Sequence, residues 1–153
     1  MFVPHLASSA TEVRRRVVLN IEDNPANVLL VEGVLQRRED LSLLTAVTGA
    51  QGVKMAARDI PDVILMDIKL PDMDGYGVFD ILHDNVSTRH VPVIALSSFA
   101  HPDDIEKGLK AGFYRYLTKP YKIDELLAAI ESAMQYAQEK SERTQYAVEM
   151  THA

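Results

Sequence analysis

Short runs of mostly apolar residues alternate along this chain with stretches in which apolar residues recur every three or four positions. Such runs, bounded by turn-forming or polar residues, are typical of strands that a parallel sheet buries on both faces. The predicted strands cover residues 16–21, 43–47, 63–67, 91–96 and 115–117. Because helical patterns separate them, the chain is predicted to adopt an α/β fold with a doubly wound, five-stranded parallel sheet.

Residues that cap helices indicate where the predicted helices begin. Asn24 is a good N-cap and Pro25 fits the first turn of a helix. Thr48 and Gln51 have the spacing of a capping box, which predicts a second helix start. The predicted helices cover residues 25–38, 48–58, 76–83, 102–111 and 123 onward.

The last predicted helix is the longest. Its expected core-facing stripe has alternating three- and four-residue steps and consists of Leu127, Ile130, Met134 and Ala137. The stripe continues through more polar positions to Val148, so we expect a helix that extends beyond the domain and frays, with homodimerisation through it left open. We therefore divide the chain into a flexible arm (1–14), a domain (15–136) and a helical extension or tail (137–153).

Composition narrows the class of protein. The chain has 153 residues, of which 47% are hydrophobic and 25% charged, as expected for one soluble globular domain. Its net charge of -6 argues against direct binding to nucleic acid or to a membrane surface. It has no cysteine, and no apolar run reaches the roughly 18 residues of a membrane span. We expect a soluble, cytoplasmic protein.

Polar residues follow four of the five predicted strands. In chain order these residues are Glu22, Asp23, Asp67, Ser97 and Lys119. The carboxyl ends of parallel strands meet at one edge of the sheet, so these side chains are expected to converge. Three carboxylates that lie close together repel one another and favour a bound cation. Without cysteine or paired histidines, the expected cation is Mg²⁺.

This set of residues suits phosphoryl transfer. Asp67 can attack as a nucleophile while Mg²⁺ and Lys119 neutralise charge on the transferred oxygens. Ser97 can donate a hydrogen bond to a phosphoryl oxygen. Each residue alone has an ordinary alternative, a solvated strand end or a turn, but the complete set on one edge is hard to explain in that way. Asp72 and Asp74 are interpreted as turn formers rather than ligands.

Residues 15–136 resemble the receiver domain of two-component response regulators. The resemblance rests on five motifs: Ile21-Glu22-Asp23-Asn24, Asp62-Val63-Ile64-Leu65-Met66-Asp67, Leu70-Pro71-Asp72-Met73-Asp74-Gly75, Pro92-Val93-Ile94-Ala95-Leu96-Ser97 and Tyr116-Leu117-Thr118-Lys119-Pro120. It implies the flavodoxin-like receiver fold with strand order 2-1-3-4-5, here with an extended C-terminal helix.

The resemblance also implies a reaction. Asp67 would accept a phosphoryl group from a phosphohistidine on a sensor histidine kinase or a phosphotransfer protein. Glu22, Asp23, Asp67 and the backbone carbonyl of Lys69 would hold Mg²⁺. Such a receiver is a phosphoacceptor switch rather than an enzyme with an external substrate, since only self-directed phosphotransfer and autodephosphorylation are expected.

Further residues take switch roles by the same resemblance. Ser97 would be the switch hydroxyl, Lys119 the partner of the phosphate, and Tyr116 an aromatic that turns inward on activation. The Lys119–Pro120 bond is expected to be cis. The signal would leave through the surface of the fourth helix, the fifth strand and the fifth helix.

The chain departs from the family at one position beside the switch hydroxyl, where Ser98 replaces the usual Ala or Gly. A side chain there could narrow access to the phosphoryl site and change the lifetime of the phosphoaspartate. Lys69 and Phe99 occupy positions that tune dephosphorylation in the family.

Three alternatives remain. The chain could be an interaction module that is no longer phosphorylated, although no site residue is lost. An aspartate-nucleophile phosphohydrolase would need a second aspartate where the chain has Lys69. The stretch after residue 136 is too short for a DNA-binding output domain, so we expect either a stand-alone regulator or the receiver module of a hybrid histidine kinase.

Overall fold

The computed structural model describes residues 14–152, which form five strands and five helices. The strands are β1 (Arg16–Ile21), β2 (Leu41–Ala46), β3 (Val63–Asp67), β4 (Val93–Ser97) and β5 (Arg115–Thr118). The helices are α2 (Pro25–Leu35), α3 (Gly49–Asp59), α4 (Gly75–Asp84), α5 (Pro102–Ala111) and α6 (Ile123–His152). Apart from Arg14, the predicted N-terminal arm lies outside the described residues.

The five strands form one sheet in the order β2-β1-β3-β4-β5, and every neighbouring pair is parallel. The predicted fold class and strand order are therefore confirmed. All the strands point the same way, so their carboxyl ends lie along a single edge of the sheet.

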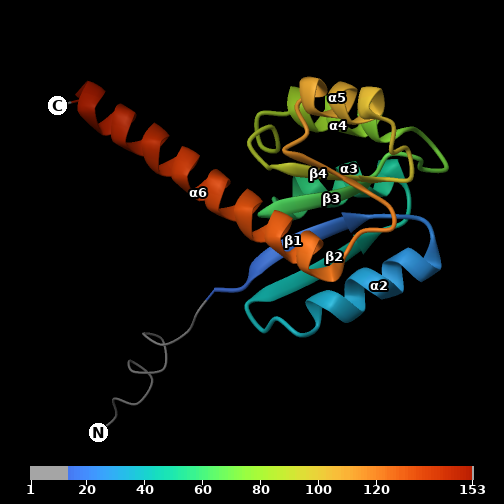
Figure 1. Cartoon of the computed structure of the whole chain (residues 1–153). Coiled ribbons are helices and arrows are strands. Elements are labelled where there is room, and N and C mark those ends of the chain that lie inside the picture. Colours follow the sequence, from blue (N-terminus) through green and yellow to red (C-terminus); the bar gives the residue numbers. More distant parts are fainter. Residues whose placement is uncertain (1–13, 153) are drawn as a thin grey trace, which may run out of the picture.

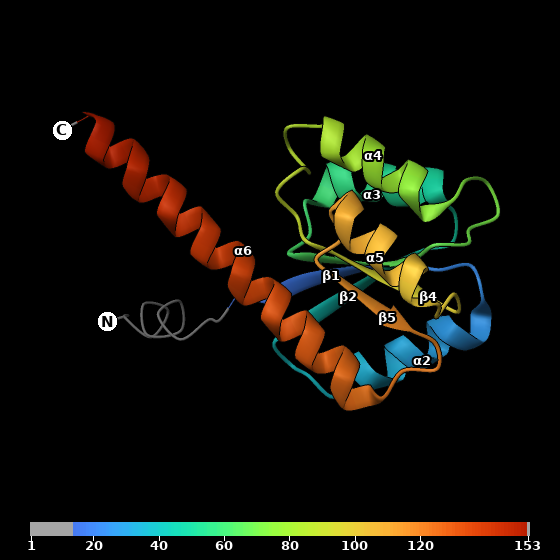
Figure 2. The same cartoon turned by 45° about the horizontal axis from the view of Figure 1, so that its top comes forward.

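Helices cover both faces of the sheet (Figures 1 and 2). α2 and the first half of α6 lie on one face, and α3, α4 and α5 lie on the other. Successive residues of a strand point to opposite faces, so Val18 joins one core and Leu19 the other. This two-sided burial explains why β1 and β3 are continuous apolar runs in the sequence.

Side-chain caps begin the helices at the predicted residues, with one difference. The Asn24 side chain accepts hydrogen bonds from the backbone N–H groups of Ala26 and Asn27. Thr48 Oγ accepts one from the N–H of Gln51, as a capping box requires. The Gln51 side chain, however, accepts from the N–H of Val47, one residue before the cap. Only half of the predicted box is formed.

The end of α2 differs from the sequence prediction. The helix ends at Leu35, before Arg37 and Arg38, and has no basic residue in its last turn. The Arg38 guanidinium instead pairs with Asp40 and with Glu131 of α6. The charge of Arg38 is therefore compensated by two carboxylates beyond the helix end rather than by the helix dipole.

Two strands start at a different residue from the one predicted. β2 begins at Leu41, two residues before the predicted start, because Leu41 pairs with Arg16 of β1. β4 begins at Val93 rather than Val91. Pro92 has no N–H to donate, and the N–H of Val91 closes a turn on the carbonyl of Thr88.

The core-facing stripe of α6 lies one position away from its predicted start. Its buried residues are Leu126, Ala129, Ile130, Ala133 and Met134. Leu127 and Ala137, both predicted to face the core, are only half-buried. Ile130 and Met134 are buried as predicted. The start of the stripe was wrong because Leu126 and Leu127 have identical side chains, and only the packing of α6 on the sheet distinguishes them.

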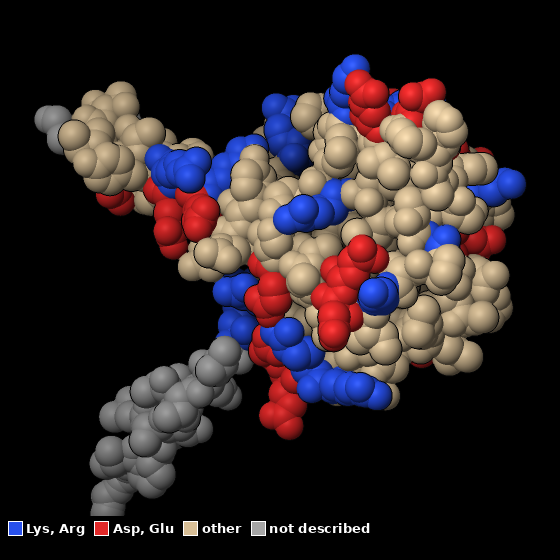
Figure 3. All heavy atoms as spheres, viewed as in Figure 1, with Lys and Arg blue, Asp and Glu red and all other residues tan. Residues whose placement is uncertain are grey.

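The second half of α6 leaves the domain. Residues 138–151 are all exposed, and the helix continues without a break to His152 (Figures 1 and 2). Side-chain hydrogen bonds four residues apart, such as that of Gln138 with Glu142, lie along it. Charges of both signs intermingle on the face drawn in Figure 3. The predicted extension is present, and its fraying stays a prediction.

Despite the length of α6, none of the helices within residues 14–152 combines the length and apolar character needed to cross a bilayer.

Candidate functional site

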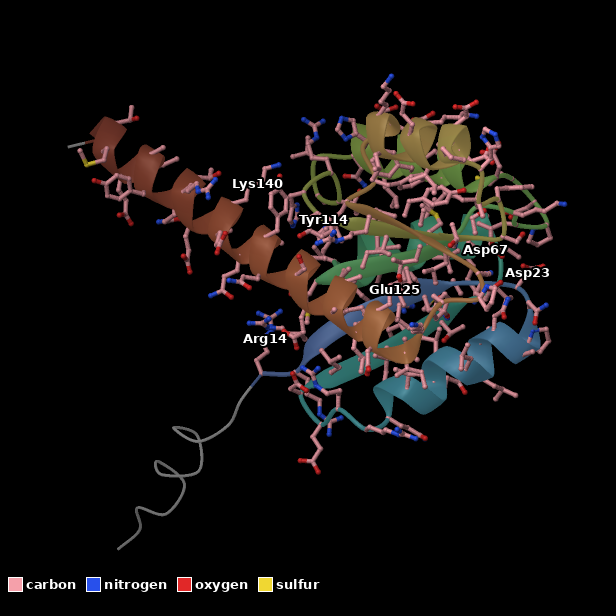
Figure 4. All side chains as sticks on the ribbon, viewed as in Figure 1. Arg14, Asp23, Asp67, Tyr114, Glu125 and Lys140 are labelled. Carbon is pink, nitrogen blue, oxygen red and sulfur yellow. The ribbon has the colours of Figure 1, made fainter. Side chains whose placement is uncertain are left out.

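The carboxyl edge of the sheet brings together the polar residues that the sequence places after its strands. They are Glu22 and Asp23 after β1, Asp67 at the end of β3, Ser97 at the end of β4 and Lys119 after β5. Figure 4 shows Asp23 and Asp67 at this end of the sheet, with Arg14 at the opposite end. The convergence expected from the parallel topology is present.

Three carboxylates form the acidic part of the site. Glu22, Asp23 and Asp67 each offer an oxygen, and these atoms lie within 4.8 Å of one another. Glu22 and Asp67 are buried, whereas Asp23 is exposed. Mg²⁺ prefers oxygen ligands and keeps several waters, so a carboxylate cluster with one solvent-facing member fits this ion.

Lys119 supplies the positive charge of the site. Its Nζ lies 2.8 Å from Glu22 Oε1 and 3.5 Å from Asp67 Oδ2. The backbone N–H of Lys119 donates to the carbonyl of Ser97 at 2.7 Å, which ties the end of β5 to the end of β4. The Lys119–Pro120 bond is cis, as expected. The lysine ammonium thus lies close to both buried carboxylates.

The two buried carboxylates titrate as a pair. Burial, and then the hydrogen bond with Glu22, raise the pKa of Asp67 to about 6, although the Lys69 amide and Lys119 act in the opposite direction. Burial alone would also raise the pKa of Glu22, but hydrogen bonds with Asp67 and Lys119 bring it below its ordinary value. Without a cation, Asp67 is therefore the harder of the two carboxyl groups to ionise.

The turn after β3 is folded tightly onto Asp67. The N–H of Lys69 donates to Asp67 Oδ1 at 3.1 Å, and the N–H of Gly75 donates to the carbonyl of Ile68 at 2.6 Å. A Cβ on Gly75 would lie 2.9 Å from Ile68 Cα and 3.0 Å from the Asp67 carbonyl oxygen. Only glycine permits this approach, so Gly75 helps to place the Asp67 carboxylate.

The two aspartates of this turn have separate structural roles. Asp74 caps α4 by accepting a hydrogen bond from the N–H of Gly77. Asp72 accepts from the N–H groups of Gly49 and Ala50 at the start of α3, which hold the pKa of its carboxyl below the ordinary value. The link from Asp72 to α3 joins distant parts of the chain and has no local signal in the sequence.

Phe99 connects the two predicted switch residues. Its backbone N–H donates to Ser97 Oγ at 3.0 Å, and its carbonyl accepts from the Tyr116 hydroxyl at 2.9 Å. Any residue other than proline could offer these backbone groups at position 99, so the sequence contained no signal for this link. A shift of the loop after β4 would therefore affect Ser97 and Tyr116 together.

The residues expected to tune the site lie at its outer rim. Ser98, Lys69 and Phe99 are exposed, and Lys69 Nζ lies 5.8 Å from the centre of the Phe99 ring. The effect of these residues on the lifetime of a phosphoaspartate stays a prediction.

A doubly wound sheet in the order 2-1-3-4-5, with an acidic cluster and a lysine at its carboxyl edge, defines the class of receiver-type signalling domains. The family model of the response regulator receiver domain matches residues 18–131. The chain belongs to this family. Receiver domains are signalling switches that interact with histidine kinases or phosphotransfer proteins.

Two curated relatives support the assignment. The response regulator PleD of Caulobacter vibrioides is 38% identical over 119 residues, which are 78% of this chain and 26% of PleD. The chain thus spans about a quarter of the length of that relative. The polar-differentiation response regulator DivK of Brucella ovis is 33% identical over 115 residues, which are 75% of this chain and 93% of DivK.

A solved structure of similar fold is the receiver domain of the sensor histidine kinase PA1611 from Pseudomonas aeruginosa. It superposes with a TM-score of 0.72 at 36% identity and covers 79% of this chain and 98% of that domain. That domain holds a magnesium ion in its active-site cleft. The carboxylate cluster of the present chain is suited to the same ion.

Proposed function

We propose that this chain is a phosphorylation switch in which Asp67 accepts a phosphoryl group from a phosphohistidine. The donor is a sensor histidine kinase or a phosphotransfer protein. The observation that carries the proposal is the position of Asp67 within reach of two other carboxylates and of the Lys119 ammonium. A nucleophile so placed has a cation site on one side and a fixed positive charge on the other.

Each site residue has a part in the transfer. An Asp67 carboxylate oxygen forms the new P–O bond as the P–N bond of the donor breaks and its electron pair returns to the imidazole. Glu22, Asp23, Asp67 and the backbone carbonyl of Lys69 are the proposed ligands of Mg²⁺. When bound, Mg²⁺ neutralises negative charge on the phosphoryl oxygens and on the carboxylates.

Lys119 and Ser97 hold the phosphoryl group once it is transferred. Lys119 already lies 3.5 Å from Asp67, so its ammonium can pair with a phosphoryl oxygen attached there. Ser97 is buried at the end of the neighbouring strand, and its O–H is free to donate because its oxygen accepts the N–H of Phe99. The three groups lie at the ends of three different strands, which makes the arrangement sensitive to a new charge.

The output surface consists of α5, β5 and α6. Leu109 of α5 and Ile123 of α6 are large apolar residues on it, exposed by 48% and 43%. Exposed apolar side chains on a small domain suit a partner protein better than solvent. We place this activity in the cytoplasm, where ATP supplies histidine kinases with phosphoryl groups, and expect no reaction beyond self-directed phosphotransfer and autodephosphorylation.

A specific observation favours a second arrangement of the same function. The similarity to the receiver of the sensor kinase PA1611 supports a receiver module that works within a hybrid histidine kinase. In that arrangement, the phosphoryl group on Asp67 passes onward to a phosphotransfer protein. A stand-alone regulator would instead bind its target through the α5-β5-α6 surface.

Hydrogen exchange tests the switch. The protein is compared with and without beryllofluoride and Mg²⁺, since beryllofluoride mimics a phosphoryl group on aspartate, and Asp67→Asn serves as the control. We expect changed protection in the loop after β4, in α5 and in β5 of the wild type alone. Unchanged exchange in these segments, with beryllofluoride bound, would leave a phosphoacceptor that does not act as a switch.

A further inference from the structure

We infer that Asp72 is a positioning residue for the magnesium site, because it attaches the loop that carries the Lys69 carbonyl to the start of α3. This β3–α4 loop consists of residues 68–74. The inference rests on the proposed function, since it takes the Lys69 carbonyl as one of the Mg²⁺ ligands. Asp72 is not itself one of the proposed ligands, so its part is to hold the loop in place.

The base of the β3–α4 loop is closed by backbone contacts. Lys69 and Asp74 pair as an isolated antiparallel bridge. The N–H of Gly75 donates to the carbonyl of Ile68 at 2.6 Å. These contacts join the two ends of the loop to each other, and they leave its tip, which carries Asp72, to be held by another part of the chain.

The tip of the loop is held by the backbone of α3, which lies beside α4 on the same face of the sheet (Figures 1 and 2). Asp72 Oδ1 accepts a hydrogen bond from the N–H of Gly49 at 2.8 Å, and Oδ2 accepts one from the N–H of Ala50 at 2.9 Å. Neither N–H group has a partner within the helix. α3 has no acidic residue in its own first turn, so the carboxylate that complements its dipole comes from the loop.

A second contact fixes the tip at the same place. A Cβ built on Gly49 would lie 2.7 Å from Met73 Cγ and 3.2 Å from Asp72 Oδ1. It would also lie 2.8 Å from Val78 Cγ2 of α4. The loop therefore lies closer to α3 than a residue with a side chain at position 49 would permit. Glycine is a poor helix former, and here its lack of a side chain makes room for the loop.

Both attachments affect the magnesium site through Lys69. Its carbonyl is the proposed ligand, and its N–H donates to Asp67 Oδ1 at 3.1 Å, so the loop also orients the proposed phosphoacceptor. A loop that is free at its tip has to be ordered before its carbonyl can bind a cation, and that ordering weakens the binding. Asp72 provides the order in advance. Groups that orient the ligands of a metal commonly change its affinity by roughly ten- to a hundredfold.

The attachment predicts an effect in the opposite direction as well. If the hydrogen bonds of Asp72 strengthen the binding of Mg²⁺, then Mg²⁺ strengthens those hydrogen bonds by the same factor. The amide protons of Gly49 and Ala50 should therefore exchange with water more slowly when Mg²⁺ is bound. This effect reaches the start of α3, which contributes no proposed ligand.

The first test is a titration with MgCl₂, followed through the backbone amide NMR signals of the site. We expect Asp72→Ala to weaken the binding of Mg²⁺ roughly tenfold. Asp72→Asn keeps one acceptor oxygen and should lose less. Unchanged affinity in Asp72→Ala would overturn the inference. Should Asp72→Ala not fold, the same titration of Asp72→Asn decides, and unchanged affinity there would overturn the inference.

Two control variants separate positioning from other effects. Asp74→Asn removes the same charge from the same loop, and asparagine can still cap α4 through its side-chain oxygen. Thr48→Ala removes a cap of α3 that does not involve the loop. We expect both variants to change the affinity for Mg²⁺ much less than Asp72→Ala does. An equal loss in Asp74→Asn would assign the effect to charge alone, an equal loss in Thr48→Ala would assign it to the stability of α3, and either result would overturn the inference.

The second test measures the exchange of the Gly49 and Ala50 amide protons with water. We expect slower exchange at saturating Mg²⁺ in the wild type, and no dependence on Mg²⁺ in Asp72→Ala. Exchange that is independent of Mg²⁺ in the wild type would contradict the inference. Neither test uses phosphoryl transfer. A wild type that binds Mg²⁺ but takes up no phosphoryl group would refute the proposed function, and the two tests would still decide the role of Asp72.

Discussion

Two groups of residues accompany Asp67 at the edge of the sheet, and they are held in different ways. The charged group is Glu22 after β1 and Lys119 after β5, which are joined by an ion pair at 2.8 Å and are largely buried. The neutral group is Ser97 of β4 and Tyr116 of β5, which are joined through the backbone of the exposed residue Phe99. The first group is fixed by charge in a buried environment, and the second is joined by neutral hydrogen bonds in a loop.

This difference indicates a separate role for each group. A charged and buried group is costly to rearrange, because any movement would leave a carboxylate or an ammonium without its partner. Neutral hydrogen bonds of a surface loop can be exchanged for bonds to water at small cost. We therefore expect the charged group to bind the cation and the phosphoryl group, and the neutral group to move in response.

The largest expected effect on stability comes from removing the positive charge of the charged group. Lys119→Met leaves Glu22 and Asp67 buried without their counter-charge, which should lower the free energy of unfolding by about 3 kcal/mol in EDTA. Mg²⁺ should restore part of this loss, because it supplies a new counter-charge. Urea unfolding with and without Mg²⁺ measures both effects. A variant as stable as the wild type in EDTA would contradict the assigned role of the lysine.

The second effect concerns the charge on Asp67. Its pKa is raised from 3.8 to about 6 in the folded protein, so the folded state binds the proton more tightly than the unfolded chain does. The contribution of Asp67 to stability should therefore be lost as the pH rises from about 4 to 6 in EDTA, and Asp67→Asn should remove this loss and be about 2 kcal/mol more stable than the wild type at pH 7.5.

Denaturant unfolding at pH 4.5 and pH 7.5 checks this prediction. Asp72→Asn is a matched control, because its carboxyl has a lowered rather than a raised pKa. That variant should not gain stability at the higher pH. If Asp67→Asn is no more stable than the wild type at pH 7.5, Asp67 is not held at a raised pKa.

A smaller effect is expected from Asn20, which is 1% exposed in β1. Neither polar atom of its side chain has a hydrogen-bond partner within residues 14–152. Asn20→Val should raise the free energy of unfolding by about 1 kcal/mol, since it removes an unpaired buried amide, and should leave phosphorylation unchanged. A loss of stability in thermal unfolding would mean that the amide is paired in solution.

The smallest effect on stability is expected from a substitution in the neutral group. Ser97→Ala removes one neutral hydrogen bond and should cost about 1 kcal/mol or less. The variant should still take up a phosphoryl group, but hydrogen exchange in α5 and β5 should no longer change with beryllofluoride. A full response in Ser97→Ala would assign the switch to another group.

The sequence predicted the elements that local pattern determines. β1 and β3 have their predicted bounds because two-sided burial requires continuous apolar runs. The convergence of Glu22, Asp67 and Lys119 followed from the parallel topology alone. The residue at which α6 first meets the sheet could not be predicted, because Leu126 and Leu127 have identical side chains and only packing distinguishes them.

Contacts between segments that lie far apart in the chain could not be predicted from the sequence either. The link of Asp72 to the start of α3 and the bridging of Ser97 and Tyr116 by the backbone of Phe99 depend on how separate loops meet. Every residue except proline has the backbone groups that Phe99 uses here, so no side chain in the sequence indicated this connection.

The central claim is that Asp67 is the phosphoacceptor, and intact-mass measurement after incubation with acetyl phosphate and Mg²⁺ tests it most directly. Asp67→Asn and a sample in EDTA are the controls. The account predicts a gain of one phosphoryl group in the wild type, and no gain in either control. A gain that persists in Asp67→Asn, or no gain in wild type and Ser98→Ala alike, would contradict it.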